Sequence, residues 1–231
     1  MAYLTGESCF NDDKMIAAFQ ALADLTAFLP PNHTLLKYID SLYMFIQGQA
    51  AMWMGGSWDI PFLESESPGF EWDVFAPPAP QNEPRFMTFH LDAGMGLNRA
   101  SENKTAARTF LSWLTRPETG RLLANTLPGF FPMHRLQHLS PREKASLRAK
   151  QPEKPLENPH ANTFLALRNQ YPTDIRLAWE RLREGSPDGY DLMKMASVHV
   201  INGDWSAKQA ADFVQDGLST WFKPAMTCKK R

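Results

Sequence analysis

Residues 50–61 read AAMWMGGSWDIP, an apolar run followed by two glycines, an indole and the start of a helix. The short run 50–54, set between glycines, predicts a buried strand. Ser57 or Asp59 can cap the helix that follows. This order predicts that Trp58 lies on a loop that joins a strand to a helix.

Amphipathic helices dominate the rest of the chain. Apolar residues at intervals of three and four predict most of them, and boxes of the pattern S/T-x-x-E/Q predict helix starts at Thr115, Ser140 and Ser206. The predicted helices cover 13–28, 35–46, 107–114, 175–182, 190–200 and 206–221, and the predicted strands cover 72–75 and 86–98, the latter bent at its glycines.

The composition excludes several classes of protein. With 24 Lys and Arg against 25 Asp and Glu, neither a nucleic acid nor an anionic membrane surface is an expected partner. No apolar run is long enough to span a bilayer, and the N-terminus as given lacks the pattern of a signal peptide. Cys9 and Cys228 are too few for a disulfide-dense scaffold or a four-thiolate metal site, and their redox state stays open.

Catalytic and metal motifs are not found. His134 and His138 are four residues apart, but no third ligand accompanies them, and a surface pair is the simpler interpretation. Asp59 stands where a G-x-S-x-G nucleophile elbow needs glycine, and both nucleotide-binding glycine motifs are absent. The sequence therefore predicts no catalytic residue, no cofactor and no metal.

Three stretches carry a family resemblance: FIQGQAAMWMGGSW over 45–58, GMGLNRASENKTAARTFLSWL over 94–114, and VINGDWSAKQAADFVQDGL over 200–218. In this order they resemble the extracellular solute-binding proteins of family 1, the maltose-binding-protein-like sugar receptors of bacterial ABC importers. The first is similar to that family's F-x-x-G-x-A-A-M…G-x-W segment, and the second to its S-x-N-K-x-x-A-x-x-F-L-x-W-L helix. The third is similar to its closing helix.

The resemblance implies a helix-rich α/β chain with a periplasmic-binding-protein-like fold of type II, incomplete at the N-terminus because the family's first α/β section is absent. It assigns residues 1–88 and 172–231 to the second lobe, and residues 89–171 to a partial first lobe with crossing segments. It also implies a periplasmic or extracellular location, no catalytic activity, and ABC permease subunits as partners.

A sugar presents apolar C–H faces and a rim of hydroxyl groups, so its pocket needs flat aromatic side chains and a few fixed polar groups. Trp58 matches the aromatic platform, and Gly56 and Ser57 can offer backbone and hydroxyl groups. An aromatic side chain at a strand end is as readily part of the core, and this is the interpretation preferred for Trp53.

The resemblance adds further candidate binding residues, Asp92 and Gly94 in a bend and Phe131 in an aromatic loop. Arg135 follows that loop and is a candidate for contact with an anionic sugar group, although an arginine there is usually solvated. Asp92 has the alternative role of orienting the bend through an Asx-type hydrogen bond.

These observations leave three hypotheses. The first is a non-catalytic carbohydrate-binding receptor of an ABC-type importer, which holds a mono- or oligosaccharide in a cleft between lobes. The second is a truncated remnant that binds no sugar and forms a homo-oligomer through its exposed cleft wall. The third, a carbohydrate-active enzyme, requires paired carboxylates that face a cleft, and the sequence shows no motif for them.

Overall fold

The computed structural model describes residues 2–80, 83–89, 95–127, 129, 155–175 and 181–228. The chain divides into two compact units. The terminal unit consists of Met1–Tyr38 and Arg176–Arg231, and the central unit of Ile39–Ile175. These units do not test the predicted lobes, 1–88 with 172–231 and 89–171, which stay a prediction.

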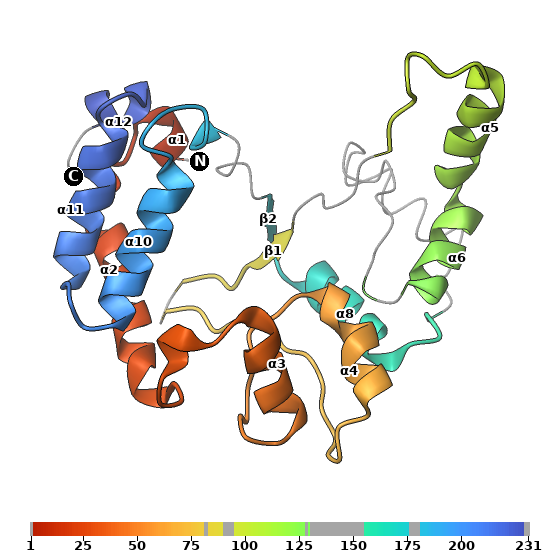
Figure 1. Cartoon of the computed structure of the whole chain (residues 1–231), viewed down its shortest axis with the longest axis horizontal. Coiled ribbons are helices and arrows are strands. Elements are labelled where there is room, and N and C mark those ends of the chain that lie inside the picture. Colours follow the sequence, from red (N-terminus) through yellow and green to blue (C-terminus); the bar gives the residue numbers. More distant parts are fainter. Residues whose placement is uncertain are drawn as a thin grey trace. The chain divides into compact units, whose positions relative to one another are not determined.

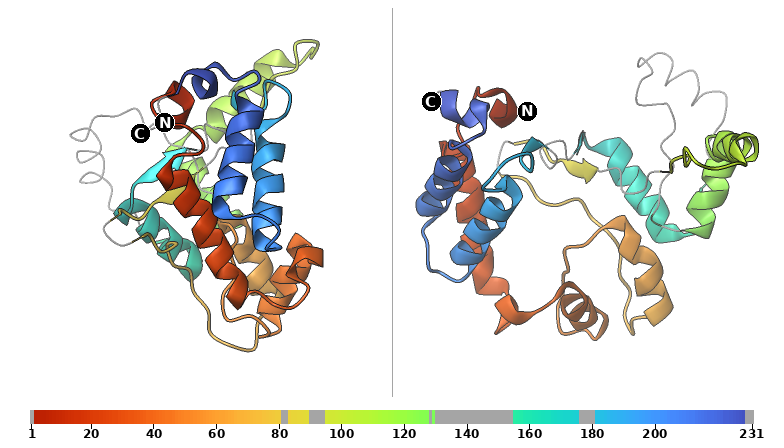
Figure 2. Two further views of the ribbon diagram at one scale, coloured as in Figure 1. Left: turned by 90° about the vertical axis from the view of Figure 1, so that its left-hand side faces the viewer. Right: turned by 45° about the horizontal axis from the view of Figure 1, so that its top comes forward.

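Three helices form the body of the terminal unit: α2 (Asp13–Leu25), α10 (Gly189–Ile201) and α11 (Ala207–Leu218). Figure 2 shows them side by side. Alanines on α10 and α11 allow close approach of the helices, because their side chains are small and buried. The core residues of these helices are Phe19, Leu192, Ala196, Val200, Ala207, Ala210, Ala211, Val214 and Leu218.

Local sequence signals explain where these helices begin. Asp12 caps α2 by accepting a hydrogen bond from the Met15 N–H at 2.9 Å. The predicted helix 13–28 is confirmed as α2 followed by the 3₁₀ turn η1 (Thr26–Phe28). Ser206 caps α11 in the predicted capping box, in which the Gln209 side chain accepts from the Ser206 N–H at 2.9 Å.

The two ends of the chain are tied together inside the terminal unit. Cys9 and Cys228 form a disulfide across a sequence separation of 219 residues. The buried Gln215 side chain accepts from the Phe10 N–H at 2.7 Å and donates to the Ala225 carbonyl at 2.8 Å. It thereby joins the segment before α2 to α11 and to α12 (Lys223–Thr227). The N-terminal helix α1 (Ala2–Thr5) also contacts α12.

The central unit is also mainly helical (Figure 1). One sheet is present among its described residues, a parallel pair in which Met87 of β1 (Met87–Phe89) is opposite Thr173 of β2 (Thr173–Ile175). The prediction of a helix-rich chain is confirmed, whereas the described residues show little of the sheet that an α/β fold implies. The other elements are α3 (Tyr38–Ile46), the 3₁₀ turn η3 (Ser57–Asp59), α4 (Ile60–Glu66), α5 (Lys104–Leu114), α6 (Pro117–Thr126) and α8 (Pro159–Gln170).

Two predicted strands are wrong. Residues 50–54 have no regular structure, and Met52 and Met54 are 71% and 80% exposed. A strand needs a hydrogen-bonded neighbour, and no described segment pairs with this run. Residues 72–75 also have no strand, because their neighbour is the helix α8, to which Asp73 is hydrogen-bonded.

Other boundaries are corrected or lie outside the described residues. Thr115 does not cap α6, because Pro117 occupies its first turn and Arg116 is the N-cap. Ile175 ends a strand, and residues 176–180 of the helix predicted over 175–182 lie outside the described residues. β1 lies within the strand predicted over 86–98, of which residues 90–94 are also outside the described residues. The helix start predicted at Ser140 lies outside the described residues.

Candidate functional site

The turn that carries Trp58 is held by the residue that follows it. The Asp59 side chain is buried and accepts a hydrogen bond from the Gly56 N–H at 2.9 Å. The Asp59 N–H donates in turn to the Gly56 carbonyl at 3.0 Å. These reciprocal bonds close η3 and fix the start of α4, whose Ile60 and Leu63 are buried.

Each indole of this segment lies over a glycine. A Cβ atom at Gly55 would be 1.9 Å from the Trp53 ring, and one at Gly56 would be 2.4 Å from the Trp58 ring. Trp53 is half-buried and its Nε1 donates to the Ser41 hydroxyl at 3.3 Å. Trp58 is 43% exposed. The paired glycines therefore make room for two indoles, of which Trp58 is the more accessible to solvent.

Ser57 attaches this turn to a distant segment. Its hydroxyl donates to the Gly129 carbonyl at 2.5 Å, across 72 positions of sequence. Gly129 follows α6 and is buried. The turn is thus fixed internally by Asp59 and externally by Gly129.

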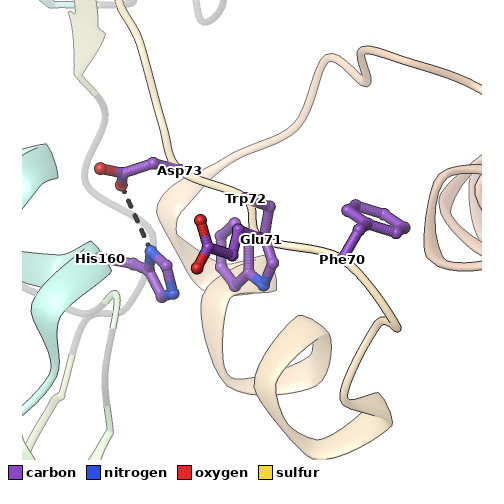
Figure 3. A pocket seen from close by; sticks show the side chains of 5 residues that line it. All are labelled: Phe70, Glu71, Trp72, Asp73 and His160. Atoms are coloured by element: carbon purple, nitrogen blue, oxygen red, sulfur yellow. Dashed lines mark hydrogen bonds and ion pairs between the residues drawn. The ribbon is translucent and has the colours of Figure 1, made fainter.

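An open depression lies on the same unit (Figure 3). It measures about 680 Å³, and Phe70, Glu71, Trp72, Asp73 and His160 line it. The rings of Trp72 and His160 are stacked with centroids 3.7 Å apart. The His160 Nδ1 lies 3.3 Å from an oxygen of Asp73. The depression thus combines aromatic surface with polar groups that can accept hydrogen bonds from hydroxyls.

The side of the depression formed by α8 is anchored to α4. Asn158 caps α8 by accepting from the Ala161 N–H at 2.8 Å, and its amide donates to Glu64 of α4 at 2.5 Å. One turn along α8, the Thr163 hydroxyl donates to Asp73 at 3.2 Å. The extended segment 70–73 is therefore held against a capped helix and not against a neighbouring strand.

Two functional candidates were not predicted from the sequence. The sequence pattern predicts a strand at Trp72, and His160 is 88 positions further along the chain with no motif around it. A local signal is present, because Trp72 and Asp73 are adjacent and follow the aromatic Phe70. This pattern is typical of a surface with both aromatic and polar side chains. Nothing in the sequence pairs that signal with His160, because only folding brings them together.

The structure brings Gly56, Ser57 and Trp58 together in one turn. The remaining predicted binding residues, Asp92, Gly94, Phe131 and Arg135, lie outside the described residues, as does the pair His134 and His138. Among the side chains that line the depression in the described part, none is Lys or Arg. In that same part of the chain, no group of three His, Cys, Asp or Glu side chains is placed to hold a metal ion.

Residues 8–121 match the family model of the bacterial extracellular solute-binding proteins. The match includes the Trp58 turn and the segment 70–73. No curated protein matches the chain. Within the described helices, none combines the length and the low polarity needed to cross a bilayer.

Proposed function

We propose that this chain, which belongs over residues 8–121 to the family of bacterial extracellular solute-binding proteins, binds a mono- or oligosaccharide for an ABC importer. The family implies a solute ligand and ABC transporter partners, and its members are typically non-catalytic. The carbohydrate and the residues that contact it are the proposal.

The exposed indole of Trp58 is the observation that carries this proposal. An indole presented on a rigid turn offers a flat apolar face to the C–H face of a pyranose, and its stacking loses little conformational entropy because the turn is already fixed. The Ser57 hydroxyl donates to Gly129 and retains lone pairs that can accept a hydrogen bond from a sugar. Gly56 has its N–H engaged by Asp59, so its role is to make room for the indole.

The disulfide supports a location outside the cytoplasm. Disulfides persist in oxidising compartments, and Cys9 with Cys228 forms one in the terminal unit. A periplasmic or extracellular location agrees with the family. We therefore propose that the protein folds and acts after export.

Isothermal titration with a panel of neutral mono- and oligosaccharides tests the proposal. We expect heat of binding with at least one sugar, and Trp58→Ala should weaken that affinity about 10- to 100-fold, as expected for loss of an aromatic anchor. Trp113→Ala is the matched control, because Trp113 is 37% exposed on α5 and outside the Trp58 turn. Absence of heat across the panel, or equal affinities of the two variants, would contradict the proposal.

A second candidate, self-association without sugar binding, is favoured by one observation. Met52, Met54, Phe75 and Phe110 of the central unit are each more than half exposed, and association that covers exposed apolar side chains is favourable. Sedimentation velocity over a hundredfold range of protein concentration separates the two candidates. A concentration-dependent dimer together with silent titrations would favour self-association, and a monomer would exclude it.

A further inference from the structure

Gly129 contacts the backbone of the Trp58 turn directly. Beyond the hydrogen bond from the Ser57 hydroxyl to the Gly129 carbonyl, the α-carbon of Gly129 faces the Ser57 peptide. A Cβ atom at position 129 would lie 1.7 Å from the Ser57 carbonyl oxygen and 3.2 Å from the Trp58 nitrogen. Both of these are main-chain atoms, so no side-chain rotation relieves the overlap.

The backbone conformation imposes the same restriction. Gly129 has a φ of +89°, in the region that side-chain-bearing residues rarely adopt. Two independent features, the positive φ and the contact with Ser57, therefore both require glycine at this position.

We infer that Gly129 is a positioning residue for Trp58, and that a side chain at this position changes the presentation of the indole and weakens ligand binding. This inference rests on the proposed function. The turn itself is closed by the buried Asp59, whose side chain accepts from the Gly56 N–H, so residues 56–59 are held together as one unit. A side chain at position 129 must move the main chain of that residue away from this turn, which breaks the hydrogen bond from Ser57 and changes the surroundings of the indole.

Three other glycines in the described part of the central unit differ from Gly129. At Gly55 and Gly56 the nearest atoms to an added Cβ are side-chain ring atoms of Trp53 and Trp58, not main-chain atoms. At Gly96 an added Cβ would meet nothing within 4 Å. Gly96→Ala is therefore a matched control for Gly129→Ala within the same unit.

Fluorine NMR of the protein labelled with 5-fluorotryptophan tests the inference without any ligand. The chain has 7 Trp, and Trp58→Phe assigns the Trp58 resonance by its disappearance. Gly129→Ala should shift the Trp58 resonance, whereas Gly96→Ala should leave it in place. If Gly129→Ala leaves the Trp58 resonance unchanged, the inference is wrong.

Affinity provides the second readout. For the sugar that binds the natural protein, Gly129→Ala should lose about tenfold or more in affinity, and Gly96→Ala should stay within about twofold. Equal affinities of these two variants would overturn the inference. If no sugar binds the natural protein, the proposed function fails, and the Trp58 resonance still decides the role of Gly129.

Ser57 supplies a milder variant in case Gly129→Ala does not fold. In the ligand-free protein, Ser57→Ala removes the hydrogen bond to Gly129, and it should shift the Trp58 resonance. Ser57→Thr keeps a hydroxyl and should leave the resonance closer to its natural position. The reverse order of these two variants would contradict a positioning role for the contact between Ser57 and Gly129.

Discussion

Buried Gln215 shows how one side chain can hold three segments together. Its amide accepts from the Phe10 N–H and donates to the Ala225 carbonyl and to the Ser219 hydroxyl. Gln215→Leu should lower the free energy of unfolding by about 2–4 kcal/mol, because buried main-chain groups lose their partners. Urea unfolding measures this loss.

The control for Gln215 is Gln20→Leu, at an exposed position of α2 in the same unit. Its side chain bonds only to the exposed Asp24, so the substitution should change the free energy of unfolding by no more than about 0.5 kcal/mol. Similar losses for both variants would mean that the hydrogen bonds of Gln215 contribute little.

Tyr3 makes the stability of the terminal unit depend on pH in alkaline solution. Burial, the hydrogen bond to Asp12 and the negative charge of Asp12 together raise the pKa of Tyr3 from 10.0 to about 12. Between these values the unfolded chain loses the phenolic proton while the folded chain retains it, so stability falls as the pH rises from about 10 to 12.

The substitution Tyr3→Phe removes the titrating group. The variant should lose this part of the pH dependence, as measured by urea midpoints at pH values on either side of 10. An unchanged slope in the variant would show that other groups cause the alkaline loss of stability.

At the scale of elements, two stretches that fit the same capping-box pattern have different roles. Ser206 caps α11, whereas Thr115 donates its hydroxyl to the Ser112 carbonyl within the preceding helix. Ser206→Ala should therefore cost about 1 kcal/mol of stability, and Thr115→Ala no more than about 0.5 kcal/mol. Thermal unfolding of the two variants makes this comparison, and an equal or reversed order would contradict the assigned caps.

Sequence reasoning predicts the elements whose signals are local. The cap of α11 and the glycine turn before Trp58 depend on residues a few positions apart, and they are found as predicted. The strand over 50–54 is not found, because a strand depends on a partner that the segment itself does not specify. For the same reason, neither the stacking of Trp72 on His160 nor the contact of Ser57 with Gly129 is predictable locally. The prediction of a helix start at Thr115 is wrong, because Pro117 occupies the first turn of α6 and Arg116 is its N-cap.

At the scale of the whole molecule, the disulfide closes almost the entire chain into one loop. Closing a loop of this length removes much conformational freedom from the unfolded chain. Reduction, or the double substitution Cys9→Ser with Cys228→Ser, should lower the free energy of unfolding by roughly 2–5 kcal/mol.

Urea unfolding with and without a phosphine reductant measures the contribution of the disulfide. The natural protein should lose stability in the reductant, and the double variant should be insensitive to it. A natural protein that is equally stable in both conditions would show that the bridge does not stabilise the fold.

The proposed function depends on stacking of the Trp58 indole on a sugar. Titrating the fluorotryptophan-labelled protein with the sugar that gives heat in calorimetry tests this contact directly. The Trp58 resonance should shift and saturate with the calorimetric dissociation constant, while the Trp113 resonance stays in place. A ligand that binds with the same constant and leaves the Trp58 resonance unmoved would contradict this stacking.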